Sequence, residues 1–234
     1  MNFLCTPATS TRRTQPRLAL LVVVALLQAA AVFPAQASKL MALKGQVLVE
    51  RKQETVNLSV GSVVLEADTL VVAPDGEALL RFKDGALMVL RSDSRVTFDK
   101  LVQAGAFKKR KKTLRVLKGT VRYVSGKLTH QVPVAFETNS VSIGIRGTDI
   151  EIAVADEGLA GNPAGTYLKV NTGQAVLVGL DGTQVEVEPG QVAFGSEPEL
   201  TPRGGSGVRR PAARRIEGAS TGLFKAGSLD SLLR

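Results

Sequence analysis

A dense run of basic residues is the feature of this sequence most able to bind a charged partner. Five consecutive bases are followed closely by a sixth: Lys108, Lys109, Arg110, Lys111, Lys112 and Arg115. Positions 100–136 hold ten bases and no acid, whereas the rest of 38–195 holds ten bases and 17 acids. Because a dense block of like charge repels itself, it predicts an anionic partner: a lipid headgroup, an envelope polysaccharide or an acidic protein. A solvated loop without a partner is the alternative.

Residue types that support catalysis or metal binding are scarce. The 234-residue chain has one histidine, His130, and one cysteine, Cys5, which excludes multi-histidine and thiolate metal sites. The sequence contains no nucleophile motif, phosphate-binding loop or paired-carboxylate pattern. We therefore expect no enzyme activity, no metal and no cofactor, and a structural role for His130. Nucleic acid is not an expected partner, because no aromatic residues alternate with the bases.

The N-terminal residues have the pattern of a secretory signal peptide. Three arginines within 1–17 precede an apolar run over 18–33, and the small-residue triplet 35–37 follows it. This order predicts export, with cleavage after Ala37 that removes Cys5 and places the mature chain in the periplasm. The alternative is an uncleaved anchor, although the run is shorter than the roughly 20 residues that a spanning helix needs. No transmembrane helix is expected in the mature chain.

From 40 to 194 the sequence alternates with a period of two. Residues 141–145, 149–154 and 184–188 each place apolar side chains on one face and polar ones on the other, as half-buried strands do. Asp-Gly pairs and single glycines separate these runs at intervals suited to tight turns. The sequence therefore predicts an all-β fold, with a single domain of many short strands arranged as a β-solenoid, a roll or a sandwich.

The composition changes after residue 195. Residues 196–220 are rich in Pro, Gly, Ser and Arg, which predicts a flexible basic tail. The last stretch recovers apolar residues, and Leu229, Leu232 and Leu233 would share one side of a short helix. So short a helix is unstable alone in water, so this end is either frayed or a peptide that folds on docking to a partner groove. The chain thus divides into a signal peptide 1–37, a β-domain 38–195 and a tail 196–234.

One part of the predicted domain resembles a known family. Residues 136–150 contain a strand-like run, an Arg-Gly-Thr step and a second strand-like run, an order that resembles the hallmark of the FecR family. The step and the residue after it are Arg146, Gly147, Thr148 and Asp149. Further pieces resemble the family's strands in order, including a Phe-x-Asp-Gly hairpin: residues 58–62, 68–70, 77–90, 114–123, 168–178 and 187–192.

The Arg-Gly-Thr step has a structural interpretation. Gly147 predicts a turn that a residue with a side chain would not accept. Arg146 is expected to bind carbonyl groups or a carboxylate at that turn. The alternative is an arginine that faces a ligand.

The resemblance implies an exported β-domain of a signalling system. In the best-known members this domain relays a signal from an outer-membrane receptor to a sigma factor. Only 17 residues precede the apolar run here, too few for the family's sigma-binding segment. We therefore expect a stand-alone, non-catalytic periplasmic protein, a signalling or adaptor module that binds an envelope protein through a sheet edge, the basic run or the tail. The alternative is a structural envelope protein that binds anionic polysaccharide or lipid through the basic run and tail.

Overall fold

The structure is a computed structural model that describes residues 36–100, 112–126, 133–155, 162–196, 213–217 and 221–233. Outside these ranges lie Cys5, His130, the predicted signal peptide up to residue 35, and Lys108, Lys109, Arg110 and Lys111 of the basic run. The described ranges contain strands and two short 3₁₀ helices, so the predicted all-β fold is confirmed. No helix in these ranges is long and apolar enough to cross a membrane.

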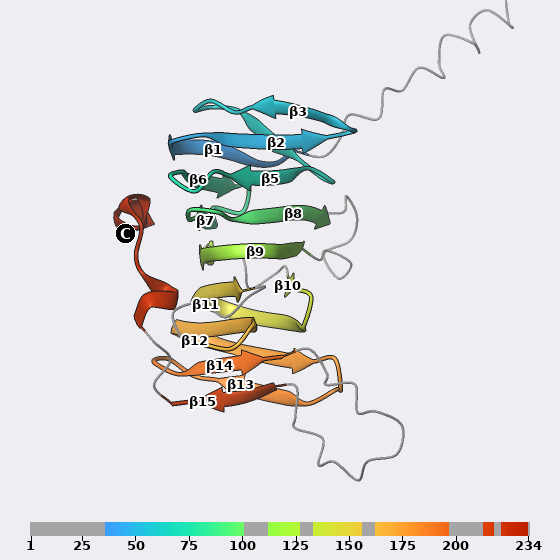
Figure 1. Cartoon of the computed structure of the whole chain (residues 1–234), viewed down its shortest axis with the longest axis vertical. Coiled ribbons are helices and arrows are strands. Elements are labelled where there is room, and N and C mark those ends of the chain that lie inside the picture. The colour runs from blue at the N-terminus through green and yellow to red at the C-terminus, as the bar shows by residue number, and fades with distance from the viewer. Residues whose placement is uncertain are drawn as a thin grey trace, which may run out of the picture. The chain divides into compact units, whose positions relative to one another are not determined.

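Fifteen strands form one continuous hydrogen-bonded sheet, which divides into two ladders that share three long strands (Figure 1). The first ladder has the order β3 (Glu54–Asn57), β2 (Val47–Arg51), β5 (Thr69–Val72), β8 (Arg95–Lys100), β9 (Lys112–Val124), β10 (Val134–Glu137), β11 (Val141–Ala155), β12 (Gly165–Gly179) and β13 (Gln184–Val187). The second ladder has the order β4 (Val63–Leu65), β1 (Gln36–Lys44), β6 (Glu77–Phe82), β7 (Leu87–Leu90), β9, β11, β12, β14 (Val192–Gly195) and β15 (Ala213–Ile216). Neighbouring strands are antiparallel except for β9 and β10.

The long strands β9, β11 and β12 run from one ladder into the other. In β9 the residues up to Lys118 pair with β8 and β10, and those from Gly119 onward pair with β7 and β11. Gly119 permits the bend because its φ is +85° and a Cβ there would lie 2.5 Å from the Cα of Ser94, a position that favours glycine. Gly173 has the same role in β12, with φ of +81°. These strands therefore join the two ladders into one domain.

The hydrophobic core lies between the ladders and is built from the inward positions of the alternating pattern. Val49 of the first ladder and Leu80 of the second belong to the same buried cluster. Aromatic rings from both ladders contact one another inside it, with centroids 5.2 to 6.2 Å apart: Phe82, Phe98, Tyr123 and Phe136. The period-two pattern thus encodes a core between two sheet surfaces.

The described C-terminal residues pack against the domain. Strand β15 extends the second ladder by pairing with β14. Two 3₁₀ helices, η3 (Thr221–Phe224) and η4 (Ser228–Leu233), lie over the outer surface of the second ladder, where η4 contacts β6 and β7 (Figure 1). The predicted flexible tail is therefore wrong for residues 213–217 and 221–233. The physical reason is a second apolar surface, formed by outward residues such as Leu79 and Val89, which the tail covers.

Candidate functional site

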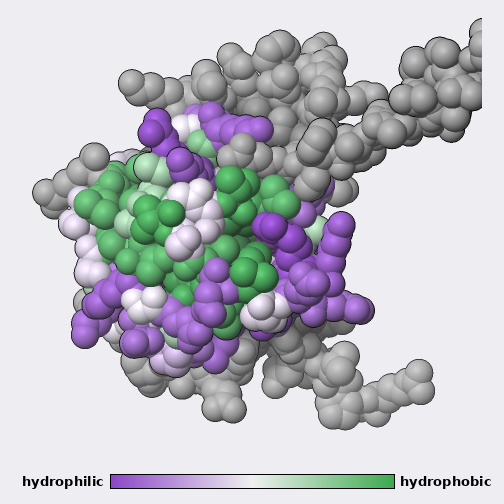
Figure 2. Space-filling view, turned by 90° about the horizontal axis from the view of Figure 1, so that it is seen from above, coloured by the Kyte–Doolittle hydropathy of each residue, from purple (hydrophilic) through white to green (hydrophobic). Residues whose placement is uncertain are grey.

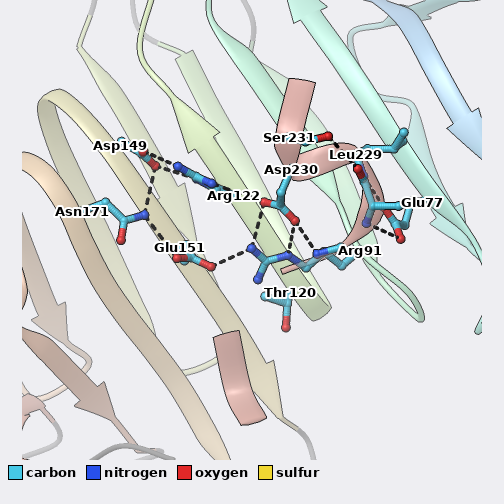
Figure 3. A network of polar contacts seen from close by, with 12 residues as sticks. Glu77, Arg91, Thr120, Arg122, Asp149, Glu151, Asn171, Leu229, Asp230 and Ser231 are labelled. Atoms are coloured by element: carbon cyan, nitrogen blue, oxygen red, sulfur yellow. Dashed lines mark hydrogen bonds and ion pairs between the residues drawn. The ribbon is translucent and has the colours of Figure 1, made fainter. Parts of the chain in front are cut away.

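Arg91 is held between two carboxylates beneath η4 (Figure 3). Its Nε and Nη2 atoms donate to the two carboxylate oxygens of Asp230 at 3.0 and 2.9 Å, and Nη2 also donates to Glu151 of β11 at 2.7 Å. All three side chains are at most 7% exposed. A buried, two-point contact between guanidinium and carboxylate fixes direction as well as charge. Asp230 is therefore recognised by geometry, across 139 positions of the sequence.

Polar side chains from neighbouring strands extend this network. Arg122 of β9 donates two hydrogen bonds to Asp149 of β11, at 3.0 and 2.6 Å, and lies 3.7 Å from Asp230. Asn171 of β12 donates to both Asp149 and Glu151 at 3.2 Å (Figure 3). Contacts within the sheet thus orient Asp149 and Glu151, and η4 contributes the third carboxylate, Asp230.

The charges of the network balance only while η4 is in place. Three cations face three carboxylates: Arg91, Arg122 and Lys169 against Asp149, Glu151 and Asp230. Without Asp230, three cations would face only two carboxylates, and the buried guanidinium of Arg91 would lose one of its two counter-charges, which is unfavourable. This surface is therefore suited to receive a carboxylate.

Glu77 of β6 binds the first residues of η4. Its carboxylate accepts hydrogen bonds from the backbone N–H groups of Ser228 and Leu229, at 3.0 and 2.8 Å, and from Ser228 Oγ at 3.1 Å. Because the first N–H groups of a helix have no partner within it, Glu77 acts here as a capping residue supplied by the sheet. Gly227 permits the approach, since a Cβ there would lie 2.7 Å from a Glu77 carboxylate oxygen.

Two of the three tail leucines predicted to bind a partner contact the domain instead. Leu233 is 9% exposed and packs with Leu79 and Val89, and Leu229 is half-buried beside the same cluster. Leu232 is 51% exposed. We call the sheet surface that holds this segment the η4 site, which consists of Glu77, Leu79, Val89, Arg91, Arg122 and Glu151.

The preceding helix, η3, has its own contact. Leu223 is 2% exposed and packs with Tyr167 and Phe194, and Thr120 Oγ1 donates to the carbonyl of Leu223 at 3.5 Å. This contact anchors η3 on β11 and β12, apart from the leucines of η4.

Hydrogen bonds keep the acids of the η4 contact charged. Burial acts to raise the pKa of Asp230, but hydrogen bonds from Arg91 and from the N–H of Gly227 outweigh it and hold that pKa below its ordinary value of 3.8. Burial also acts to raise the pKa of Glu77, and the N–H groups of η4 outweigh it, so this pKa lies below 4.5. For Arg91, burial acts to lower the pKa, while its two carboxylate partners raise it on balance. The contact therefore depends on both carboxylates being ionised.

Lys112, the first residue of β9, lies in the core, so its prediction as a partner-binding residue is wrong. Its side chain is 2% exposed, and Nζ donates to Asp84 at 2.7 Å and to the Tyr123 hydroxyl at 3.2 Å. Nζ also lies 3.9 Å from the ring centre of Phe82. Burial lowers the pKa of Lys112, opposed by Asp84, and burial raises the pKa of Tyr123. The reason is strand alternation, because Lys112 shares its inward face with Leu114.

The remaining candidates of the basic run differ in position. Arg115 faces outward and forms ion pairs with Asp99 at 2.9 Å and Glu137 at 3.6 Å. Lys108–Lys111 lie outside the described residues, so the binding predicted for them stays a prediction.

The Arg-Gly-Thr step lies at the irregular part of β11, where the strand passes between the ladders. Gly147 has φ of +61°, a conformation that favours glycine as expected, but it lies at an irregularity inside strand β11 and not at a turn. Thr148 is 2% exposed, and Asp149 accepts the hydrogen bonds of Arg122. The backbone of Arg146 pairs with Gln174 of β12. Its side chain is exposed and forms no hydrogen bond or ion pair with a described residue, so the partner expected for it is not found there. The carboxylate of this segment, rather than its arginine, joins the polar network.

Both ladders begin with a strand that has only one neighbour among the described residues. Strand β3 pairs with β2, and β4 pairs with β1, so each has a row of unpaired backbone groups. Four large apolar side chains at this open end are 38 to 61% exposed: Met41, Val56, Val60 and Val63. Figure 2 views this end and shows apolar side chains gathered at its centre, with hydrophilic ones around them.

The described residues contain little that resembles an active site. A pocket of about 290 Å³ is lined by Asn139, Ser140, Val154, Ala155, Ala164, Gly165, Thr166 and Ser196, none of which is ionisable. Within the described ranges, no three His, Cys, Asp or Glu side chains are grouped as metal ligands.

The sequence analysis did not identify Glu77, Arg91 or Asp230. Arg91 directly follows the four apolar residues of β7, and Asp230 directly follows Leu229 and precedes Ser231. A charge next to apolar residues is the one available signal, because a buried charge needs a partner. Nothing in the sequence pairs two residues so far apart.

Comparison with known proteins agrees with the order of the motifs. Residues 68–175 match the family described as FecR protein. Over these residues the chain is similar to FecR proteins. The matched segment extends from the start of β5 into β12, so it includes Arg91, Arg122 and the Arg-Gly-Thr step, whereas η4 lies outside it. No curated protein matches the sequence.

Two solved structures are similar to this chain in part of their fold. Both are crystal structures from Parabacteroides distasonis of what is described as a candidate anti-sigma factor. One is 10% identical with a TM-score of 0.46, and the other is 11% identical with a TM-score of 0.45; each comparison covers 56% of this chain. The chain matches 56% and 55% of the lengths of those two proteins.

Proposed function

We propose that this protein, which is similar to FecR proteins over residues 68–175, is a non-catalytic signalling or adaptor module that acts in the periplasm and binds an envelope protein at its open end. The observation that carries the proposal is that β3 and β4 are edge strands, each with one neighbour among the described residues, and that exposed apolar side chains lie around them. A strand of a partner protein can add to such an edge, with backbone hydrogen bonds for affinity and side-chain contacts for specificity. Val56 on β3 and Val63 on β4 are the exposed apolar side chains of the two edge strands.

The environment of the described bases favours a protein partner over an anionic polymer. Lys112 is buried, Arg115 forms ion pairs with two acids, and Lys118 lies 2.7 Å from Asp93. Binding of polysaccharide or lipid would therefore depend on Lys108–Lys111 and on arginines of the tail, of which Arg214 and Arg215 are exposed. An interaction of that kind would weaken steeply as the salt concentration rises, which separates it from strand addition.

The proposed location rests on the N-terminal sequence pattern. Cleavage after Ala37 would leave Ser38 as the first residue, and its backbone already pairs with β4 and β6. The mature chain would thus keep most of β1 and the open end would be preserved.

A pull-down from an envelope extract, repeated at rising salt concentration, tests the proposal. The bait is the mature chain 38–234, compared with a Val56→Lys/Val63→Lys variant, because lysine on an edge strand opposes strand addition. Leu180→Lys is the matched control, since Leu180 is 60% exposed and lies outside the open end. A fourth bait replaces Lys108–Lys111 with serine and keeps the buried Lys112.

We expect one discrete envelope protein that survives moderate salt and is lost only with the edge variant. Retention of that protein by the edge variant would contradict the proposal. Anionic lipid or polysaccharide that is released by salt and lost only with the serine variant would establish the envelope-binding alternative.

A further inference from the structure

The sheet surface beneath η4 recognises a peptide segment by features that another protein could also supply. We propose that the η4 site is a peptide-recognition site, and that a partner protein displaces η4 by inserting a segment of the same chemistry. That segment is a short turn with glycine, a small capping residue, leucine, aspartate and a second leucine, in the spacing of Gly227–Leu233. This proposal does not depend on the open end, because the η4 site lies on a different surface of the second ladder.

Three contacts define what the η4 site accepts. Glu77 accepts two free backbone N–H groups at the start of a turn, and a Cβ at the preceding position, occupied by Gly227, would press on the Glu77 carboxylate. Arg91 requires a carboxylate two residues after the capping serine. The apolar floor of Leu79 and Val89 accepts one leucine three residues further on. These requirements describe a sequence-specific ligand rather than a generally apolar one.

The contact of η4 has the features of an exchangeable ligand. Its six residues are too few to form a helix alone, so its structure depends on the site. Only Leu233 is buried among its leucines, while Leu229 is half-buried and Leu232 is exposed. Segments with so little buried apolar area open at low free-energy cost compared with the core.

The resident segment also leaves part of the site unused. Nη1 of Arg91 is buried and has no hydrogen-bond partner among the described residues. An unpaired buried donor is unfavourable, so a partner segment that places an acceptor there would gain a contact that η4 lacks. The positive charge exposed when Asp230 leaves favours an acidic partner segment in the same way.

Fluorescence anisotropy with a labelled synthetic peptide of residues 221–234 tests the proposal on the full mature chain. The wild-type chain is compared with Asp230→Asn, which weakens the resident segment and leaves the residues of the η4 site unchanged. A second protein variant carries both Asp230→Asn and Glu77→Gln. Two further peptides each carry one substitution. One has Asp230→Asn, and the other has Leu232→Ser as a matched control, because Leu232 is exposed. Leu233→Ser replaces Asp230→Asn in the protein if the latter does not fold by circular dichroism.

We expect Asp230→Asn to bind the peptide about tenfold more tightly than wild type, because charge-assisted contacts dominate the site. The protein with both Asp230→Asn and Glu77→Gln should bind the wild-type peptide only weakly. The protein with Asp230→Asn alone should bind the Asp230→Asn peptide weakly and the Leu232→Ser peptide as tightly as the wild-type peptide. Absence of peptide binding to the folded variants would overturn the proposal. Equal binding of the peptide with Asp230→Asn would also overturn it. Concentration-dependent dimers of the wild-type chain that the free peptide dissociates would assign the site to a second copy and overturn the assignment to a partner protein.

Discussion

Lys112 Nζ lies 2.7 Å from the carboxylate of Asp84, and the lysine side chain is 2% exposed. Asp84 belongs to the Phe-x-Asp-Gly hairpin between β6 and β7, where its other oxygen accepts the N–H of Ala86 at 3.0 Å. The end of the basic run is thus fixed inside the domain by the hairpin motif. A positive charge that looks like part of a binding surface in the sequence is part of the core.

Breaking this pair should destabilise the domain strongly. Asp84→Asn should lower the free energy of unfolding by about 3 kcal/mol, because the buried ammonium loses its counter-charge. Adding Lys112→Met to that variant should restore most of the loss, since the unpaired charge is then removed. Urea unfolding measures both. A double variant as unstable as Asp84→Asn alone would contradict this account of the pair.

The bend of β9 should depend on the absence of a side chain at Gly119. Gly119→Ala should lower the free energy of unfolding by at least about 1–3 kcal/mol, the cost of placing alanine at a positive φ. The contact of the new Cβ, 2.5 Å from Ser94, adds to that loss. Gly144→Ala in β11 is the matched control, since a Cβ there meets nothing within 4 Å. Thermal unfolding of both variants checks this, and equal midpoints would show that the bend does not need glycine.

Replacing Arg146 and replacing Asp149, the charged residues on either side of the Gly147-Thr148 pair, should have different effects on the free energy of unfolding. Arg146→Ala should change the free energy of unfolding by less than about 0.5 kcal/mol, because the side chain is exposed. Asp149→Asn should lower it by about 1–3 kcal/mol, since Arg122 then loses its charged partner. Urea midpoints of the two variants measure the contrast. A large loss for Arg146→Ala would show that the arginine has a structural partner after all.

Attachment of η4 should depend on pH through Glu77 and Asp230. Both have pKa values below their ordinary values of 4.5 and 3.8 when η4 is bound. Lowered pKa values mean that this stabilisation is fully present above the ordinary values and is lost as the pH falls through the lower, bound-state values. NMR chemical shifts of the Ser228 and Leu229 amides should therefore move toward those of a free peptide below about pH 4. In Glu77→Gln the same transition should be smaller, and an unchanged transition would assign it to other groups.

The sequence and the structure agree wherever the information is local. Alternation of side chains with a period of two depends only on neighbouring residues, and it predicted strands such as 141–145 and 184–188 correctly. Gly147 was visible as a break in that alternation, although it lies inside the long strand β11 and does not separate two strands. The composition of the tail pointed to flexibility, but composition does not show whether a sheet offers a surface for the tail to cover.

The sequence by itself determined that this protein is an all-β chain, because backbone preferences and alternation are properties of short segments. The order of its motifs also indicated a similarity to FecR proteins, which the match over residues 68–175 repeats. Only the tertiary structure decided which charges are buried. Lys112 pairs with Asp84 across 28 positions, and Arg91 pairs with Asp230 across 139. Burial of a charge depends on a partner brought close by the fold, and the free energy of such a pair is absent from either segment alone.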